Sequence, residues 1–88
     1  MVEREIKVIN TLGVHARPAS KIVQTANKYK STISLCRGTT TADAKSILNV
    51  MMLGANYDTS ITIRASGVDE REAVDAIASL FELKFNEE

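Results

Sequence analysis

The chain has 88 residues, 44% of them hydrophobic, so we expect one small domain (residues 1–88) with a single core. Eleven Lys and Arg balance eleven Asp and Glu. The single cysteine, Cys36, excludes a disulfide within the chain, and one cysteine with one histidine cannot form a zinc site unaided. No apolar run is long enough to cross a bilayer, and the charged start is unlike a signal peptide, so we expect a cytoplasmic protein. We also expect a monomer.

The two halves of the chain differ in charge. Residues 1–45 carry eight basic and three acidic side chains, and residues 46–88 carry three basic and eight acidic ones. The basic half contains His15, so an acidic partner could be steered to that side. The same split is also consistent with two solvated faces.

A first strand is predicted at the start of the chain, where Val2, Ile6 and Val8 alternate with charged residues. Residues 10–13 then form a turn that ends in a glycine. The alternation indicates that one face of this strand is buried.

A helix is predicted from Ala16 to about Tyr29. Pro18 fits its first turn, where backbone amide hydrogens need no partner inside the helix. Polar residues on the opposite side predict an exposed face, formed by Arg17, Lys21, Gln24 and Lys28. Apolar residues at helical spacing predict a buried stripe, formed by Ala19, Ile22, Val23, Ala26 and Tyr29.

Two strands and a short helix follow. The strands are predicted at 31–37 and 39–42, and a glycine turn joins them. Ser46 has the position of an N-cap for a helix over 47–53, which a glycine then ends.

A last strand is predicted at 60–65, before a final helix. Asp69 and Glu72 have the spacing of a capping box at the start of that helix. The order β-α-β-β-α-β-α favours an α+β fold, with one sheet covered on one face by helices. The buried face of the final helix is predicted to contain Ala73, Val74, Ile77, Leu80 and Phe81.

His15 stands where a loop becomes a helix. Exposed amide groups and the positive end of the helix dipole favour a bound anion at such a place. Arg17 adds a permanent cation whose donors suit phosphate oxygens. Histidine titrates near neutrality and can act as a nucleophile, so this arrangement indicates a residue that accepts a phosphoryl group. Taken alone, a histidine at a helix start is also consistent with a solvated cap.

The short helix at 47–53 is apolar on most sides, so its hydrophobic residues cannot all face the core. We expect Val50 and Leu53 in the core and the others in an exposed patch. Such a patch is typical of a contact surface, and its methionines suit several partners in turn.

Four segments of the chain form a recognisable set: Gly-Val-His-Ala-Arg-Pro-Ala at 13–19, Ala-Lys-Ser-Ile-Leu at 44–48, Met-Leu-Gly at 52–54 and Ala-Ser-Gly at 65–67. Together they resemble the HPr phosphocarrier family of the bacterial sugar phosphotransferase system. The resemblance runs through nearly the whole chain, in order. It implies an open-faced β-sandwich, in which a four-stranded antiparallel sheet carries three helices on one face.

The resemblance also implies a stoichiometric carrier rather than an enzyme. Nδ1 of His15 would accept a phosphoryl group from phosphorylated enzyme I and pass it to IIA proteins for sugar uptake. Arg17 would neutralise charge on the phosphoryl oxygens, with no metal and no cofactor besides the carried group. The docking residues that the resemblance implies for these partners are Arg17, Ser20, Lys21, Gln24, Ile47, Leu48 and Met51.

The resemblance leaves two questions open. Ser46 matches a position that a regulatory HPr kinase/phosphorylase modifies in some bacteria, and this role depends on the host having that kinase. Asp43 and the segment 56–58 depart from the family pattern, so a nitrogen-related or other regulatory branch with the same His15 chemistry remains the alternative.

Two other function classes fit less well. An RNA-binding sheet needs aromatic residues on its strands, and none of the four aromatic residues lies in a predicted strand, so we expect no nucleic-acid partner. A self-sufficient enzyme is disfavoured because no second general acid or base lies near His15 in the sequence and no glycine-rich nucleotide loop is present.

Overall fold

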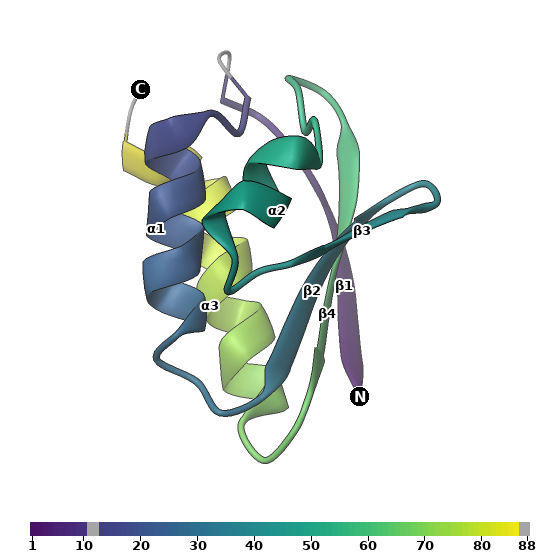
Figure 1. The fold of residues 1–88 in the computed structure, drawn as a ribbon, viewed down its shortest axis with the longest axis vertical. Coiled ribbons are helices and arrows are strands. Elements are labelled where there is room, and N and C mark those ends of the chain that lie inside the picture. Colours follow the sequence, from purple (N-terminus) through teal and green to yellow (C-terminus); the bar gives the residue numbers. More distant parts are fainter. Residues whose placement is uncertain (11–12, 87–88) are drawn as a thin grey trace.

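The computed structural model describes residues 1–10 and 13–86, and it contains one four-stranded sheet covered on one face by helices (Figure 1). All neighbouring strands are antiparallel, in the order β1-β4-β2-β3. The predicted open-faced α+β fold and its element order are therefore confirmed. The strands are β1 (Val2–Lys7), β2 (Thr32–Arg37), β3 (Thr40–Asp43) and β4 (Ser60–Ser66), and the helices are α1 (Ala16–Ala26), α2 (Ile47–Met52), α3 (Glu70–Glu82) and the short 3-10 helix η1 (Lys84–Asn86).

The register of the sheet sends apolar side chains toward the helices and polar ones to the open face. Ile63 of β4 pairs with Leu35 of β2, and both are fully buried. On the open face, Arg64 of β4 forms an ion pair with Glu3 of β1. None of the described strands contains an aromatic residue, as the sequence pattern predicts.

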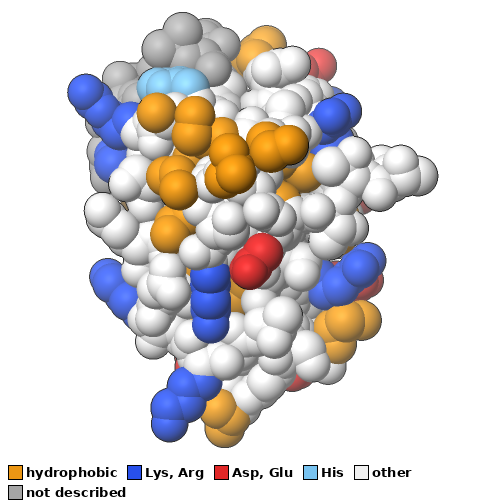
Figure 2. All heavy atoms as spheres, viewed as in Figure 1, with side chains coloured by type: hydrophobic (Ala, Val, Ile, Leu, Met, Phe, Trp, Pro, Cys, Tyr) orange, Lys and Arg blue, Asp and Glu red, His pale blue; other side chains and the backbone are white. Residues whose placement is uncertain are grey.

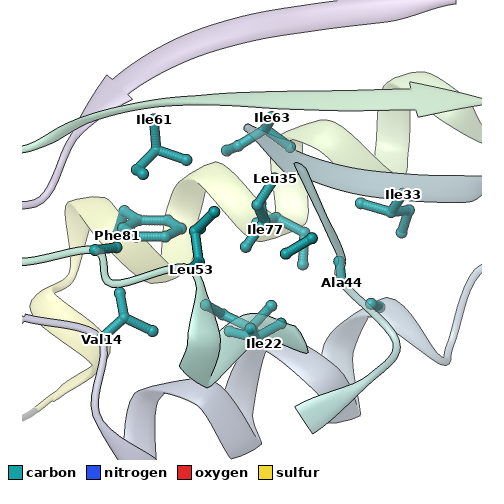
Figure 3. Packing of buried hydrophobic residues seen from close by; sticks show 14 of the residues in the cluster. Val14, Ile22, Ile33, Leu35, Ala44, Leu53, Ile61, Ile63, Ile77 and Phe81 are labelled. Atoms are coloured by element: carbon teal, nitrogen blue, oxygen red, sulfur yellow. The ribbon is translucent and has the colours of Figure 1, made fainter. Parts of the chain in front are cut away.

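The core lies between the sheet and the helices (Figure 3). Ile22 of α1 and Ile77 of α3 are fully buried there, and such side chains each stabilise a fold by about 1.5–3 kcal/mol. Val14 enters this core from the loop just before α1, near Phe81 (Figure 3), so the core holds that loop. Half-buried side chains pack at its margin, and these are Val2, Ile6, Val23, Tyr29 and Leu80.

The C-terminal turn η1, which the sequence pattern does not indicate, lies beside α1 (Figure 1). Phe85 is fully buried, and its ring meets that of Phe81 edge to face with centroids 4.9 Å apart. Nζ of Lys21 donates a hydrogen bond to the backbone oxygen of Phe85. The expected exposure of Lys21 is therefore wrong: the side chain is half-buried, because its long stem lies along the protein to reach the turn.

α1 is shorter than predicted and ends at Ala26 rather than near Tyr29. The amide group of Asn27 explains this end, because its Nδ2 donates to the oxygen of Val23 at 2.8 Å. That bond satisfies one of the carbonyls that a helix leaves unpaired at its C-terminus.

The predicted capping box of Asp69 and Glu72 is wrong, since the Asp69 side chain makes no capping bond to α3. The carboxylate instead accepts from the amides of Lys30 and Ser31, both at 2.9 Å, and from the hydroxyl of Ser31. These bonds, the hydroxyl bond foremost, lower the pKa of Asp69. Asp69 thus connects the turn after α1 to the start of α3, a long-range contact that competes successfully with the local cap.

Candidate functional site

His15 is the N-cap residue of α1 and has extended backbone angles, φ −95° and ψ −163°. Its carbonyl accepts the amide of Ala19 at 2.9 Å, which begins the helix. The ring is half-buried and its Nε2 is buried. Figure 2 shows the histidine side chain, in pale blue, at the molecular surface. The predicted place of His15 at a loop-to-helix junction is confirmed.

The loop before His15 is fixed by backbone contacts with the segment that follows α2. The amide of Val14 donates to the oxygen of Ala55 at 2.8 Å. Gly13 has a φ of +68°, and a Cβ added there would lie 2.8 Å from the same oxygen. Only glycine combines this left-handed conformation with so close an approach. Gly13 therefore sets how the chain enters α1.

The start of α1 is electropositive. Ala16 and Arg17 carry amides in the first turn and Pro18 carries none, while the exposed Arg17 adds a full positive charge. The first turn contains no acidic side chain, in contrast to α3, whose first turn contains Glu70 and Glu72. The dipole of α1 is therefore uncompensated at this end, and a helix N-terminus favours an anion by about 0.3–1 kcal/mol.

Ser46 caps α2 as predicted. Its Oγ accepts from the amide of Asn49 at 3.3 Å and from the side-chain nitrogen of the same residue at 3.1 Å. At the other end of α2, Nε of Arg37 donates to the oxygen of Leu53 at 2.7 Å. The sequence gives no signal for this second contact, because Arg37 and Leu53 lie in different elements.

Four hydrophobic side chains of α2 are exposed, and we call them the α2 patch: Ile47 (44%), Leu48 (63%), Met51 (45%) and Met52 (72%). Val50 and Leu53 are buried, as expected. α1 and α2 pack against each other. Figure 2 shows hydrophobic side chains gathered over this region, directly beside the histidine. The structure therefore places an apolar surface next to the candidate nucleophile.

The remaining predicted docking residues lie on α1, and they differ in what they contact. Gln24 is exposed and its Nε2 donates to Oγ of the half-buried Ser20 at 3.4 Å. Lys21 is directed to the C-terminal turn instead. Arg17 and His15 are together at the start of the helix.

Asn10 is a residue of the site region whose importance the sequence analysis missed. It is fully buried, and its Nδ2 donates to the oxygen of Gly13 at 2.6 Å. An asparagine at the start of a turn that ends in glycine is a recognisable signal, because its short polar side chain bonds nearby backbone.

The part of the chain that the structure describes contains no cluster of three or more His, Cys, Asp or Glu side chains that could hold a metal ion. None of its helices has the length and apolar character needed to cross a membrane.

Comparisons with known proteins agree over nearly the whole chain. A family model described as "PTS HPr component phosphorylation site" matches residues 2–82. The chain is 44% identical over 88 residues to a phosphocarrier protein HPr of Xylella fastidiosa (strain Temecula1), covering 100% of this chain and 99% of that protein. It is 42% identical over 86 residues to a phosphocarrier protein NPr of Proteus mirabilis, covering 97% and 96%. The crystal structure of HPr-C-His from Thermoanaerobacter tengcongensis has a TM-score of 0.96 at 42% identity, covering 100% of this chain and 99% of that one.

Proposed function

Because the chain belongs to the PTS HPr family of phosphocarrier proteins, we propose that His15 takes a phosphoryl group from phosphorylated enzyme I and passes it to IIA proteins for sugar uptake. The observation that carries this proposal is the position of His15, half-buried at the uncompensated positive end of α1. Arg17 stands two residues further on and adds a second source of positive charge.

In the proposed step, a lone pair of Nδ1 of His15 attacks phosphorus. A phosphorus–nitrogen bond forms while the bond between phosphorus and enzyme I breaks. The burial of Nε2 supports Nδ1 as the attacking atom. Arg17 and the first amides of α1 stabilise the phosphoryl oxygens as the group is transferred.

A carrier must also release its cargo. A phosphorus–nitrogen bond is labile compared with a phosphate ester on serine, so His15 suits transfer in both directions. The helix end adds about 0.3–1 kcal/mol, or up to about 2 kcal/mol if partly buried, which orients the group without trapping it. The protein is accordingly a stoichiometric carrier, and the phosphoryl group on His15 is its only cargo.

The docking surface that we propose comprises the α2 patch with Arg17, Ser20, Lys21 and Gln24 of α1. Enzyme I and the IIA proteins would use it in turn, and flexible methionine side chains suit partners of different shape. The basic first half of the chain favours acidic partner surfaces. The ammonium of Lys21 has three donors, so its bond to Phe85 leaves two of them for a partner.

Ser46 is the proposed site of regulatory phosphorylation by an HPr kinase/phosphorylase. A phosphate there adds up to about two negative charges at the start of α2, where the helix tolerates them. The added charge would repel an acidic partner from the neighbouring α2 patch. Phosphorylation of Ser46 would therefore inhibit docking rather than unfold the helix.

A second candidate function is the nitrogen-related or other regulatory branch of the same system. The similarity to an NPr phosphocarrier at 42% identity favours it as an alternative. The chemistry at His15 would be the same, and the output would be signalling instead of transport. Comparing transfer to sugar-specific and nitrogen-related IIA proteins distinguishes the two branches.

The test of the proposed chemistry is incubation with enzyme I, magnesium and phosphoenolpyruvate. The protein should gain an acid-labile phosphate that is absent from His15→Ala and retained in the control variant Ser46→Ala. Phosphate that persists in His15→Ala, or no phosphate with several enzyme I homologues, would contradict the proposal.

A further inference from the structure

Two polar side chains are fully or almost fully buried in the described part of the chain, Asn10 at 0% exposure and Ser31 at 1%. They lie on either side of α1. Ser31 is explained by its bonds to Asp69, which join the turn after α1 to α3. Asn10 precedes the loop that leads into His15, and its side chain has no such partner in another of the described elements. Its burial therefore needs a local explanation.

The contacts of Asn10 converge on one residue. Its Nδ2 donates to the oxygen of Gly13 at 2.6 Å, and the amide of Gly13 donates back to the oxygen of Asn10 at 3.1 Å. Both polar backbone groups of Gly13 are thus held by Asn10. The remaining side-chain oxygen, Oδ1, meets no donor among the residues that the structure describes. A buried amide oxygen without a hydrogen-bond donor lowers the stability of a fold, so stability alone does not explain an asparagine at this position.

The chain from Gly13 to His15 is fixed at each residue. Asn10 holds Gly13, the amide of Val14 donates to the oxygen of Ala55 at 2.8 Å, and the oxygen of His15 accepts the first helical bond. A change in the Gly13 peptide would therefore shift the backbone from which the His15 ring extends. Misplacing a reacting group by about 1 Å can slow a reaction by about 100-fold.

We propose that Asn10 is a positioning residue for phosphoryl transfer at His15, an inference that rests on the proposed function. Because Asn10 is fully buried, it cannot touch a docked partner. It acts through the Gly13 carbonyl, which sets the entry of the chain into α1. Replacing Asn10 should therefore lower kcat for phosphorylation by enzyme I and leave KM unchanged.

The experiment compares Asn10→Ala with the matched control Ser31→Ala, which also removes a buried, hydrogen-bonded polar side chain, but one that donates to the Asp69 carboxylate at the far end of α1. Both variants should lose thermal stability. At a temperature where both are folded, kcat for phosphorylation by enzyme I should fall about 10-fold in Asn10→Ala, with KM unchanged. Both constants of Ser31→Ala should stay within about twofold of the wild-type values, which is the scatter expected of a distant site.

Equal kcat values for the two variants would overturn the role of Asn10. If Asn10→Ala does not fold, Asn10→Ser replaces it, because its hydroxyl keeps a polar group in the site but ends one bond short of the Nδ2 that donates to Gly13. A wild-type kcat in Asn10→Ser would then overturn the role, and a reduced kcat would support it. If the wild-type protein takes no phosphate on His15, the proposed function itself is refuted. Equal kcat values for the two variants would refute only the role of Asn10.

Discussion

Gly13 offers a sharp test of how the His15 loop is held. Its φ is +68°, and a Cβ built there would lie 2.8 Å from the oxygen of Ala55 and 3.0 Å from Cα of Asn56. Both neighbours are backbone atoms, which cannot move aside as a flexible side chain does. Gly38 is the matched control, because its φ is +59° and nothing lies within 4 Å of its added Cβ.

The two alanine substitutions share the penalty of a left-handed conformation, about 1–2 kcal/mol. Gly13→Ala adds the clash with Ala55 and Asn56, and overpacking of this kind costs about 1–3 kcal/mol. We therefore expect Gly13→Ala to be less stable than Gly38→Ala by about 2 kcal/mol, which corresponds to a melting temperature lower by roughly 8–16 °C in a domain of this size.

The assay is thermal unfolding of both variants followed by circular dichroism, together with the rate of His15 phosphorylation by enzyme I at a temperature where both are folded. Relief of the clash moves Ala55 and weakens its bond to Val14, so Gly13→Ala should also be phosphorylated more slowly than Gly38→Ala. Equal melting temperatures for Gly13→Ala and Gly38→Ala would refute the close approach between Gly13 and the backbone of Ala55. A lower melting temperature with an unchanged rate would refute the link between this contact and His15.

Three further predictions concern the pH dependence, the cap and the docking surface. The bonds that lower the pKa of Asp69 stabilise the fold above the ordinary titration range of a carboxyl group, and this stabilisation is lost as the pH falls through the folded-state pKa. Urea denaturation should therefore show Asp69→Asn to be less stable than wild type at neutral pH, with the gap closing in acid, whereas the exposed ion-pair variant Asp75→Asn should change little. Ser46→Ala should lose about 1 kcal/mol in the same assay and keep the wild-type rate of His15 phosphorylation, so a slower rate would contradict a purely capping role. Leu48→Asp should raise the KM for enzyme I about 10-fold, the equivalent of about 1.4 kcal/mol, whereas the control Val68→Asp, at a more exposed residue between β4 and α3, should leave it unchanged. Equal KM values for the two variants would contradict docking on the α2 patch.

Hydrophobic periodicity was sufficient to predict the layers of this fold, because each element buries one face. The stripe of α1 and the alternation in β4 both place their apolar residues in the core. The site was predictable for a similar reason. His15, Arg17 and Ser46 lie at the starts of their own helices, so local sequence contains the information that places them.

Two of the errors concern contacts between residues far apart in the sequence. Asp69 has the spacing of a local cap, but three donors from Lys30 and Ser31 bind its carboxylate instead. Lys21 has the position of an exposed residue, but the C-terminal turn brings the carbonyl of Phe85 within its reach. Local pattern could not predict either contact, because each depends on which elements the fold places side by side.

The most direct test of the proposed carrier role is to locate phosphorus in the protein after incubation with enzyme I and phosphoenolpyruvate. Long-range proton–nitrogen correlation and phosphorus NMR distinguish the two ring nitrogens of a phosphorylated histidine. The expected result is a single phosphorus bound to Nδ1 of His15. A phosphorus bound to Nε2, or to any other side chain, would contradict it.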